Sequence, residues 1–381
     1  MQLSVVILNY NVQYFLEICI SSVQKSIQNI DAEIIVVDNN SIDDSCEMVK
    51  KLFPNVILIE NKTNLGFPKG NNIGVSSAKG EYICILNPDT IVAENTFEKV
   101  LQFAKSKSNI GIIGCQLIDG SGNFLPESKR GTPTPWVAFT KILALYKIFP
   151  NSTYFNQYYA QHLSKDQTDK VAILVGAFMV MKRQLYQQLQ GFDEDCFMYS
   201  DDIDLSYRAL KMEMTNYYFH ETSIIHFKGE STIKDQKYLK RFQEAMNYFY
   251  KKHFKVSNFF SLFMKIGIFL FSLFKKFQGK QKPKVNPSKH VFVSTSKQNF
   301  EQIQKKLKKN LQIMSFDDLH SNTILTNSEI IFDTSQITFK DQIAFMQNNQ
   351  NLHYTYKFYS SKSNFMVGSN SSNDRGEIIL F

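Results

Sequence analysis

The sequence predicts an α/β protein with a mostly parallel sheet and polar residues gathered at one of its edges, and two observations carry this prediction. Apolar runs typical of strands alternate with helix-like segments of about 10–15 residues, which indicates βαβ units and a mostly parallel sheet. Two of these runs, 34–37 and 82–86, pass directly into polar stretches that contain Asp38 and Asp89. Because ligands of open α/β folds bind beyond the carboxyl ends of the strands, we expect a nucleotide and a divalent metal along this edge.

The elements of roughly the first 255 residues follow from their apolar periodicity. Strands are predicted at 3–8, 33–37, 56–60, 82–86 and 222–227. Helices are predicted at about 14–28, from an N-cap at Ser41 to Phe53, and at 205–212. The pattern loosens from 118 to 164, where 128–136 is expected to be an irregular loop, and order returns with the apolar run 171–181.

Residues after about 283 are predicted to form a separate small α/β unit that contains no catalytic group of residues. Its strands are expected at 291–293, 330–332, 364–367 and 377–380, and its helices at 300–310 and 339–347. A chain of 381 residues is long for one compact core. We therefore divide it into a large domain at 1–255, a basic linker at 256–282 and a small domain at 283–381.

Composition restricts the class of protein and its compartment. A hydrophobic fraction of 43% is ordinary for a soluble globular protein. The five cysteines are scattered without a CxxC pair, which predicts buried free thiols in a reducing compartment and no zinc site. The first residues lack the basic flank and cleavage site of a signal peptide, so we expect a cytoplasmic protein.

Three motifs along the predicted edge suit a nucleotide and its phosphates. Asp38 can accept hydrogen bonds from a nucleoside, although its stretch is equally suited to capping a helix. Asp89 is the metal candidate because Mg²⁺ and Mn²⁺ take one or two carboxylates together with phosphate oxygens; a plain turn is the alternative. The stretch 65–72 predicts a glycine-containing loop that opens a helix, with Lys69 available to a phosphate, but it lacks the spacing of a P-loop.

Three carboxylates, Asp201, Asp202 and Asp204, lie within one short stretch and raise one another's proton affinity. Arg208 follows Asp204 by one helical turn and can pair with it, so we expect a structural Asp204 and an Asp202 that acts as a base. The alternative is a solvated acidic helix start that favours the helix dipole. A lone histidine such as His226 is more often structural, and its value depends on the acidic motifs before it.

The order of these motifs resembles glycosyltransferase family 2, and within it the rhamnosyltransferase-like branch that builds bacterial surface polysaccharides. The resemblance covers roughly residues 1–255 and rests on stretches at 5–11, 34–38, 66–72, 87–89, 191–194, 201–208 and 226. It implies a GT-A fold, an inverting mechanism, a nucleotide-diphosphate sugar donor and a divalent cation, Mg²⁺ or Mn²⁺. By position it assigns the nucleoside to Asp38, the metal to Asp89, the base to Asp202 and the metal or diphosphate to His226.

Two departures from the family pattern stand out. Asn87 takes the place of the first acid of the DxD-type motif, and Asp201-Asp202 stands where Glu-Asp is commoner. On the donor side we expect contacts from Asn9, Asn11, Asp38, Asn40, Gly66, Lys69, Asn71, Asn87 and Asp201. On the acceptor side we expect Arg130, Trp136 and Gly176.

The predicted function is transfer of a sugar, such as the deoxysugar rhamnose, to a hydroxyl of a glycan or lipid-linked acceptor in surface polysaccharide synthesis. A sugar-nucleotide nucleotidyltransferase is the alternative within enzymes, although 9–12 offers neither the glycine nor the basic residue of its usual signature. A catalytically silent membrane-associated scaffold is the alternative from another class. The presence of Asp38, Asp89 and Asp202 together argues against a silent protein.

The positive charge of the chain is concentrated between Glu244 and Glu301, a stretch without any acidic residue. Within it, 257–277 places its lysines and other polar residues on one stripe of a helical wheel. We expect an interfacial helix on the inner face of the cytoplasmic membrane, because a spanning helix would bury lysine in lipid. A core helix between the domains is the alternative, and nucleic acid is not expected because the phenylalanines are not interleaved with exposed basic residues.

Overall fold

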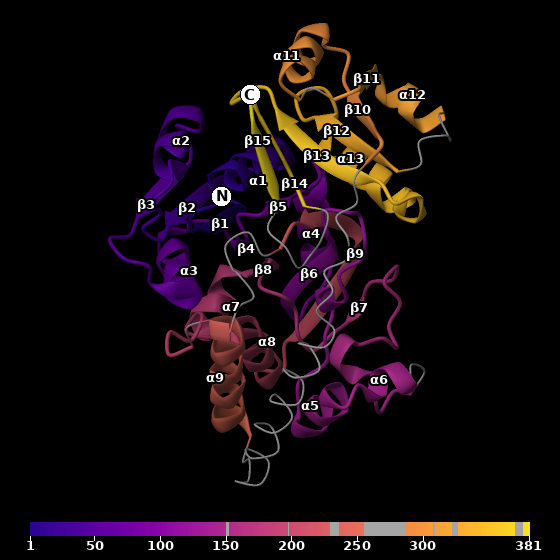
Figure 1. Ribbon diagram of the computed structural model, residues 1–381. Helices are drawn as coiled ribbons and strands as arrows, with labels where there is room; N and C mark the ends of the chain where they lie inside the picture. The colour runs from indigo at the N-terminus through magenta and orange to yellow at the C-terminus, as the bar shows by residue number, and fades with distance from the viewer. Residues whose placement is uncertain are drawn as a thin grey trace.

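The computed structural model describes residues 1–149, 152–196, 198–228, 236–254, 287–307, 309–321, 327–369 and 376–381. It contains two α/β units, which Figure 1 shows as a large unit in indigo to salmon and a small unit in orange and yellow. The large unit has a nine-stranded mixed sheet and the small unit a six-stranded one. The predicted fold class is therefore confirmed. The linker expected at 256–282 and the membrane helix expected at 257–277 lie outside the described residues.

The large unit alternates strands and helices. Its strands are β1 (Leu3–Asn9), β2 (Ala32–Asp38), β3 (Ile57–Glu60), β4 (Tyr82–Leu86), β5 (Thr90–Ile91), β6 (Ile110–Ile118), β7 (Asp169–Lys170), β8 (Phe178–Lys182) and β9 (Thr215–His226). Its helices are α1 (Gln13–Ser26), α2 (Ser45–Leu52), α3 (Gly66–Ser77), α4 (Thr96–Lys105), α5 (Pro135–Ile142), α6 (Leu145–Ile148), α7 (Arg183–Gln188), α8 (Asp201–Lys211) and α9 (Gln236–His253). Two short 3-10 helices, η1 (Pro126–Ser128) and η2 (Gln157–Tyr159), lie between β6 and β7.

The small unit repeats the pattern on a smaller scale. Its strands are β10 (Lys289–Val293), β11 (Leu311–Met314), β12 (Ser328–Asp333), β13 (Thr355–Ser360), β14 (Phe365–Gly368) and β15 (Glu377–Leu380). Its helices are α11 (Lys297–Leu307), α12 (Phe316–Ser321) and α13 (Phe339–Asn348), with a 3-10 turn η3 (Gln350–Leu352). Strands β11, β10, β12 and β13 are parallel, and β14 and β15 add an antiparallel edge.

The order of strands in the large sheet is β3-β2-β1-β4-β8-β6-β9-β5, with β7 beside β9. Strands β3, β2, β1 and β4 are parallel, whereas β8 runs antiparallel to β4 and to β6. Side chains alternate between the two faces: Val5 and Ile7 join the core beneath α1 and α4, and Val6 joins the core beneath α3 and α8. Helices on both faces account for the nearly continuous apolar runs.

Helix α3 lies unusually close to the sheet, and its glycines explain how. A Cβ atom added at Gly70 would stand 2.4 Å from Leu8 Cδ1, and one at Gly74 would stand 2.4 Å from Val6 Cγ1. The loop predicted at 65–72 is wrong, because from Gly66 on this stretch forms the beginning of α3. Turn-forming glycines and close-packing glycines look alike in a sequence, and here packing against the sheet decides between them.

Three other predicted elements differ from the structure. Helix α2 begins at Ser45, because the Ser41 hydroxyl donates to Asp38 Oδ1 at 2.6 Å and does not cap a helix. In the apolar run 171–181 only Phe178 and the residues after it form a strand. The irregular loop predicted at 128–136 ends early, since Thr134 caps α5 by accepting a hydrogen bond from the Val137 N–H, and Trp136 is helical.

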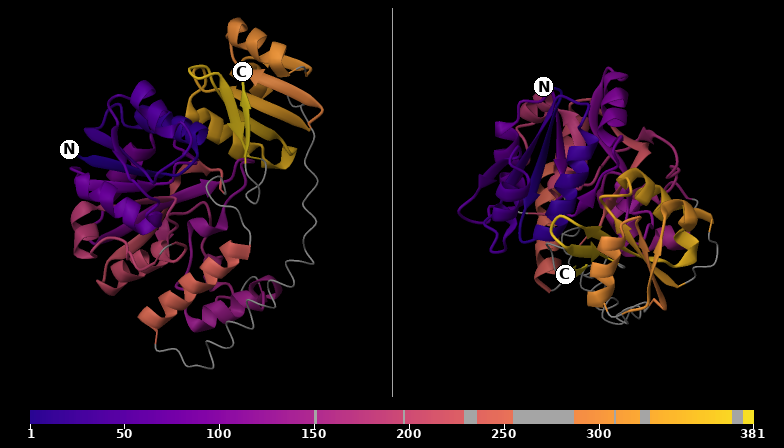
Figure 2. Two further views of the ribbon diagram at one scale, coloured as in Figure 1. Left: turned by 60° about the vertical axis from the view of Figure 1, so that its left-hand side comes forward. Right: turned by 90° about the horizontal axis from the view of Figure 1, so that it is seen from above.

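The two units share one apolar core. Phe227, which follows β9, stacks edge-on against Phe15 of α1 at 5.1 Å and against Phe358 of β13 at 5.5 Å. Both views in Figure 2 place the small unit against the large one. Polar contacts border this core: the carboxylate of Glu94 accepts hydrogen bonds from the N–H groups of Phe339 and Lys340, both at 2.8 Å. The negative charge of Glu94 therefore lies at the N-terminus of α13, where the helix dipole favours it.

Among the described residues, no helix combines the length and the apolar character needed to cross a membrane.

We predict that the two units unfold together. Phe358→Ala should lower the free energy of unfolding by about 3–5 kcal/mol, because the side chain is fully buried between them. Trp136 is the only tryptophan and lies in the large unit, so its fluorescence should report a lower melting temperature although the change is in the small unit. The exposed Ile378→Ala is the matched control. An unchanged Trp136 transition in Phe358→Ala would show that the units are independent.

Candidate active site

The carboxyl ends of the central strands bring the predicted donor residues together. Strand β1 lies between β2 and β4, and Asn9 pairs in register with Asp38. Asn87 follows β4 at the same edge, and its N–H donates to the carbonyl of Ala177, the residue before β8, at 3.1 Å. The edge therefore runs from Asp38 through Asn9 and Asn87 to the start of β8.

The Asp38 carboxylate is already hydrogen-bonded within this edge. Oδ1 accepts from Asn9 Nδ2 at 2.7 Å and from the Ser41 hydroxyl, and Oδ2 accepts from the Ser41 N–H at 2.8 Å. Asn11 holds the same loop from the other side, since its Oδ1 accepts from the Ile42 N–H at 2.8 Å. These contacts fix the position of Asp38, and they leave Oδ2 able to accept a further hydrogen bond.

The remaining donor candidates surround this carboxylate at different depths. Asn40 and Lys69 are exposed, whereas Gly66 and Asn71 are buried. The side chain of Asn39, the residue after Asp38, connects this loop to the start of α3 by donating to the Gly66 carbonyl at 3.0 Å. Within the described part of the chain, the buried oxygens Asn9 Oδ1 and Asn71 Oδ1 have no hydrogen-bond partner. Unpaired buried acceptors are rare, and their presence here is consistent with a polar ligand.

Asp89 and His226, the two predicted metal ligands, meet at this edge. Strand pairing sets Thr90 of β5 opposite His226 of β9, and this brings His226 Nε2 to 3.4 Å from Asp89 Oδ1. Asn87 Nδ2 lies 3.2 Å from the same imidazole nitrogen. The side chains of Asp89 and His226 are buried, and His226 Nδ1 has no partner among the described residues. The two residues predicted to hold a metal are therefore adjacent.

These groups fit a metal that is bound largely through a substrate. The described residues contain no group of three or more His, Cys, Asp or Glu side chains suited to a metal ion. One carboxylate and one imidazole are too few for a closed protein site, but they match a hard cation that takes its other ligands from phosphate oxygens and water. Asp89 and His226 would hold such a cation, and Asn87 would border it.

Asp202 lies at the first turn of α8 and is held through one oxygen. Its Oδ2 accepts from Arg130 Nη2 at 2.5 Å and from the Gly176 N–H at 3.1 Å. Burial alone would lower the pKa of Arg130, but the charge of Asp202 raises it above its ordinary value. A Cβ at Gly176 would come within 3.6 Å of Asp202 Cβ, so this backbone passes close by. Three predicted residues, Arg130, Gly176 and Asp202, thus form one contact.

Asp201 is buried next to Asp202 in the same helical turn. Burial first, and then the negative charge of Asp202, raise the pKa of Asp201 to about 7. The carboxyl therefore carries a proton for much of the time near neutral pH.

Asp204 has both carboxylate oxygens occupied, which confirms the predicted pairing with Arg208. Arg208 Nε donates to Oδ2 at 2.6 Å, while His253 Nε2 at 2.6 Å and Lys252 Nζ at 2.9 Å contact Oδ1. Burial would raise the pKa of Asp204, but the hydrogen bond from His253 and the positive charges of Arg208 and Lys252 lower it to about 2. Asp204 therefore anchors α9 to α8.

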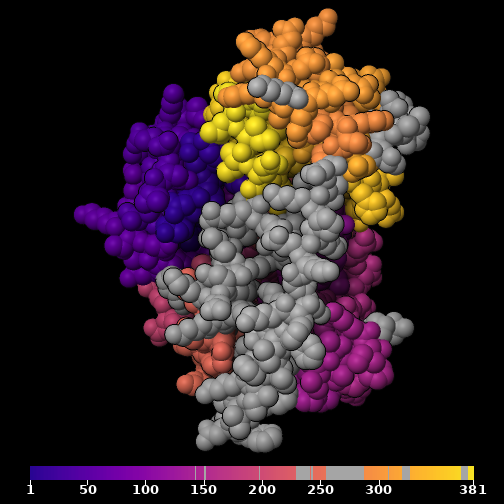
Figure 3. Space-filling view, in the orientation of Figure 1, coloured from indigo at the N-terminus to yellow at the C-terminus, as the bar shows by residue number. Residues whose placement is uncertain are grey.

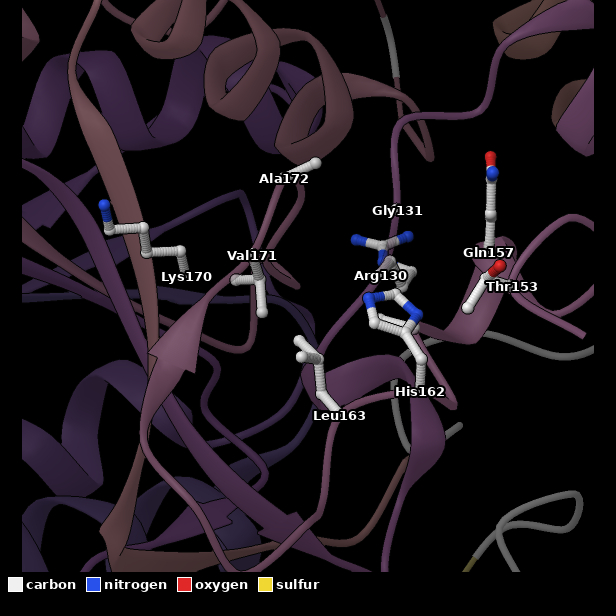
Figure 4. Close-up of a pocket in the computed structure, with 10 residues that line it drawn as sticks. Arg130, Gly131, Thr153, Gln157, His162, Leu163, Lys170, Val171 and Ala172 are labelled. Atoms are coloured by element: carbon white, nitrogen blue, oxygen red, sulfur yellow. The ribbon is translucent and has the colours of Figure 1, made fainter. Parts of the chain in front are cut away.

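A cavity of about 370 Å³ opens beside the Arg130 contact and is drawn in Figure 4. Arg130, Gln157, His162 and Leu163 line it, and Lys170 extends away from them in this view. Trp136, which was predicted to lie on the acceptor side with Arg130, is not among its lining residues. Its indole N–H instead donates to the Tyr154 carbonyl at 3.2 Å.

Two contacts in this region were not predicted from the sequence: a lysine over an aromatic ring, and an ion pair. Lys141 Nζ lies 3.1 Å from the centre of the Tyr158 ring. Burial would raise the pKa of Tyr158, but the charges of Lys141 and Arg130 lower it. Lys228, two residues after His226, forms an ion pair with Glu127. No local pattern marks these contacts, because each joins residues from separate segments of the chain.

Comparison with known proteins gives a family match and several relatives. Residues 4–190 match the family model described as glycosyl transferase family 2. An N-acetylglucosaminyl-diphospho-decaprenol L-rhamnosyltransferase of Mycobacterium tuberculosis is 24% identical over 213 residues, which cover 53% of this chain and 68% of that protein. A poly(ribitol-phosphate) beta-glucosyltransferase of Bacillus spizizenii is 29% identical over 160 residues, which cover 40% and 25%.

Among solved structures, the mannosyltransferase PcManGT from Pyrobaculum calidifontis, in complex with GDP-Man and Mn²⁺, is 17% identical to this chain. The superposition covers 71% of this chain and 69% of that one, with a TM-score of 0.47.

We predict that Asp204→Asn destabilises the fold by about 3–5 kcal/mol at neutral pH, because it leaves buried positive groups without their charged partner. Since its pKa is lowered in the fold, Asp204 stabilises the protein above its unfolded pKa, and this contribution is lost as the pH falls toward about 2. Thermal melts of the variant and of the exposed Asp195→Asn control test this. Equal melting temperatures for the two variants would remove the anchoring role.

Asp201 should have the opposite pH dependence. Its raised pKa means that the folded chain binds a proton more tightly than the unfolded chain, so stability falls as the pH rises from about 4 to about 7, by up to about 1.4 kcal/mol per pH unit. Asp201→Asn should remove this slope. The measurement is the melting temperature of both proteins across this range, and parallel curves would contradict the prediction.

Proposed function

We propose that this chain, which belongs to glycosyl transferase family 2 through residues 4–190, transfers a sugar with inversion from a nucleotide-diphosphate sugar to a hydroxyl group. The observation that carries the proposal is that Asn87 and Asp202 both contact the segment directly before β8. Asn87 reaches the segment before β8 through the Ala177 carbonyl, and the neighbouring Gly176 N–H reaches Asp202. These two contacts support Asn87 as a donor-side residue and Asp202 as the base of one site.

The acceptor is proposed to be a glycan or lipid-linked sugar used in surface polysaccharide synthesis. Support comes from the relatives: the Mycobacterium tuberculosis protein is named for an N-acetylglucosaminyl-diphospho-decaprenol substrate, and the Bacillus spizizenii protein for poly(ribitol-phosphate). The first name also supports rhamnose as the donor sugar. The cell compartment proposed for this reaction is the cytoplasm, at the inner face of the membrane.

Asp202 is the proposed general base. Its two hydrogen bonds with described residues both go to Oδ2, and Oδ1 is proposed to take the proton of the acceptor hydroxyl. The hydroxyl oxygen then forms a bond to the anomeric carbon while the bond from that carbon to the diphosphate oxygen breaks. The products are the new glycoside, the nucleoside diphosphate and a protonated Asp202.

The leaving diphosphate gathers negative charge in this step. Asp89 and His226 would hold a divalent cation, Mg²⁺ or Mn²⁺, which when bound stabilises that charge. Lys69 is exposed at the start of α3 and is proposed to contribute to phosphate binding. Asp38, Asn9, Asn11, Asn40, Gly66, Asn71 and Asp201 are proposed to hold the nucleotide sugar.

The test is release of nucleoside diphosphate from a panel of nucleotide sugars in the presence of acceptor extracts, with Mg²⁺, Mn²⁺ or EDTA. Asp202→Asn should lower kcat by about 100- to 10,000-fold because proton removal is lost. Since the substitution also removes the charged partner of Arg130, a melting temperature and donor binding by the variant show that the loss of kcat is not a loss of folding. Asp89→Asn should instead raise the metal concentration needed for donor binding.

The exposed Asp195→Asn is the matched control for both substitutions. Metal-dependent turnover of one donor that survives in Asp202→Asn would exclude this carboxylate as the base. Absence of turnover and of metal-dependent nucleotide binding across the whole panel would overturn the transferase proposal and favour a silent scaffold.

A further inference from the structure

Exposed apolar side chains gather on one short segment of the large unit. Within the described residues, twelve large hydrophobic side chains are exposed, and five of them lie between 136 and 154. We call these five residues the α5–α6 patch: Trp136 (45% exposed), Leu143 (47%), Ile148 (65%), Phe149 (48%) and Tyr154 (71%). Single exposed apolar residues are ordinary, but such a concentration marks an interaction surface.

Contacts through Phe155 and one hydrogen bond connect Trp136, Phe149 and Tyr154 of the patch. Phe155 joins its two ends, since its ring lies 6.0 Å from that of Trp136 and 5.1 Å from that of Phe149. The Trp136 indole also donates to the Tyr154 carbonyl. Helices α5 and α6 form the end of the molecule opposite the small unit, as Figures 1 and 2 show, and Figure 3 shows this region at the outer surface.

The segment that carries the patch contains basic residues and no acidic ones. From 128 to 165 the chain contains no aspartate or glutamate, while it contains Lys129, Arg130, Lys141, Lys147 and Lys165. Lys147 lies inside the patch segment and is exposed, as is Lys165. Tryptophan and tyrosine beside exposed lysine are the residues that favour the headgroup region of a membrane, and the positive charge complements anionic lipid.

The patch adjoins the cavity at Arg130. Thr153 and Gln157 line that cavity, and they flank Tyr154 and Phe155 within the same few residues. Helix α5 also packs, through Ala138, in one apolar cluster with Phe249 and Phe254 at the end of α9.

We infer that the α5–α6 patch is a docking surface for an anionic lipid membrane, with Trp136, Ile148, Phe149 and Tyr154 entering the headgroup region and Lys147 contacting acidic headgroups. The proposed function determines only why such a surface is useful: a membrane at this position holds the hydroxyl of a lipid-linked acceptor close to the cavity beside Arg130. The surface itself rests on exposure, continuity and charge, and not on activity.

The experiment is co-sedimentation of the full chain with vesicles of phosphatidylcholine alone or with added phosphatidylglycerol. The full chain should bind the anionic vesicles more strongly, and Ile148→Ser/Phe149→Ser should weaken that binding by about tenfold or more, because two apolar side chains no longer enter the lipid. Lys147→Glu should weaken binding to the vesicles that contain phosphatidylglycerol and leave binding to phosphatidylcholine vesicles unchanged. Ile42→Ser, at the most exposed apolar residue elsewhere in the described chain (92%), is the matched control and should bind like the unaltered protein.

Three outcomes would overturn the inference: no binding of the unaltered chain to either vesicle, equal binding of the Ile148→Ser/Phe149→Ser variant, or equal loss in the Ile42→Ser control. Melting temperatures of all variants should stay near that of the unaltered chain, since each altered side chain is exposed. Metal-dependent nucleotide binding is measured separately without lipid. It tests the proposed transferase, so the two proposals can fail independently.

Discussion

Burial of three carboxylates in the first turn of α8 is the constraint on which the arrangement of the site depends. A buried carboxylate is costly unless it is paired or protonated, and each of the three meets this requirement differently. Asp202 takes Arg130 from the segment after β6 together with the Gly176 N–H before β8. Asp204 takes its partners from α8 and α9. Asp201 has its pKa raised instead. One helical turn therefore fixes segments that are far apart in the chain.

The position of His226 beside Asp89 depends on a different contact, the apolar core shared by the two units. His226 ends β9, and Phe227, the next residue, is buried between Phe15 and Phe358. The Phe227 N–H also donates to the Asp89 carbonyl at 3.0 Å. A shift of the small unit would therefore displace the segment that sets His226 beside Asp89. The sequence offered no role for the small unit, and this packing gives it one: it supports the strand end that carries the imidazole.

The local parts of this site were predictable, and the distant contacts were not. A strand that ends in an acid places that acid at the sheet edge in any parallel sheet, so Asp38 and Asp89 could be located from their own neighbourhoods. Arg208 is one helical turn from Asp204, which made that pair predictable as well. Arg130 reaches Asp202 across 72 positions of sequence. Partners of that kind depend on how α5 and η2 fold over the sheet, a region whose apolar pattern was too irregular to predict helices.

The two carboxylates Asp204 and Asp202 differ in how their oxygens are bonded, and this difference fits an anchoring role for Asp204 and the proposed base role for Asp202. Asp204 has ion-pair or hydrogen-bond partners on both oxygens, and a proton taken there would disrupt the attachment of α9. Among the residues that the structure describes, Asp202 is bonded only through Oδ2, so its orientation is fixed while Oδ1 can receive a proton. The pair with Arg130 gives the buried Asp202 carboxylate a charged partner. Because catalysis by a general base requires a carboxylate oxygen that faces the acceptor hydroxyl, the Arg130 contact would serve the proposed reaction by fixing the orientation of Asp202.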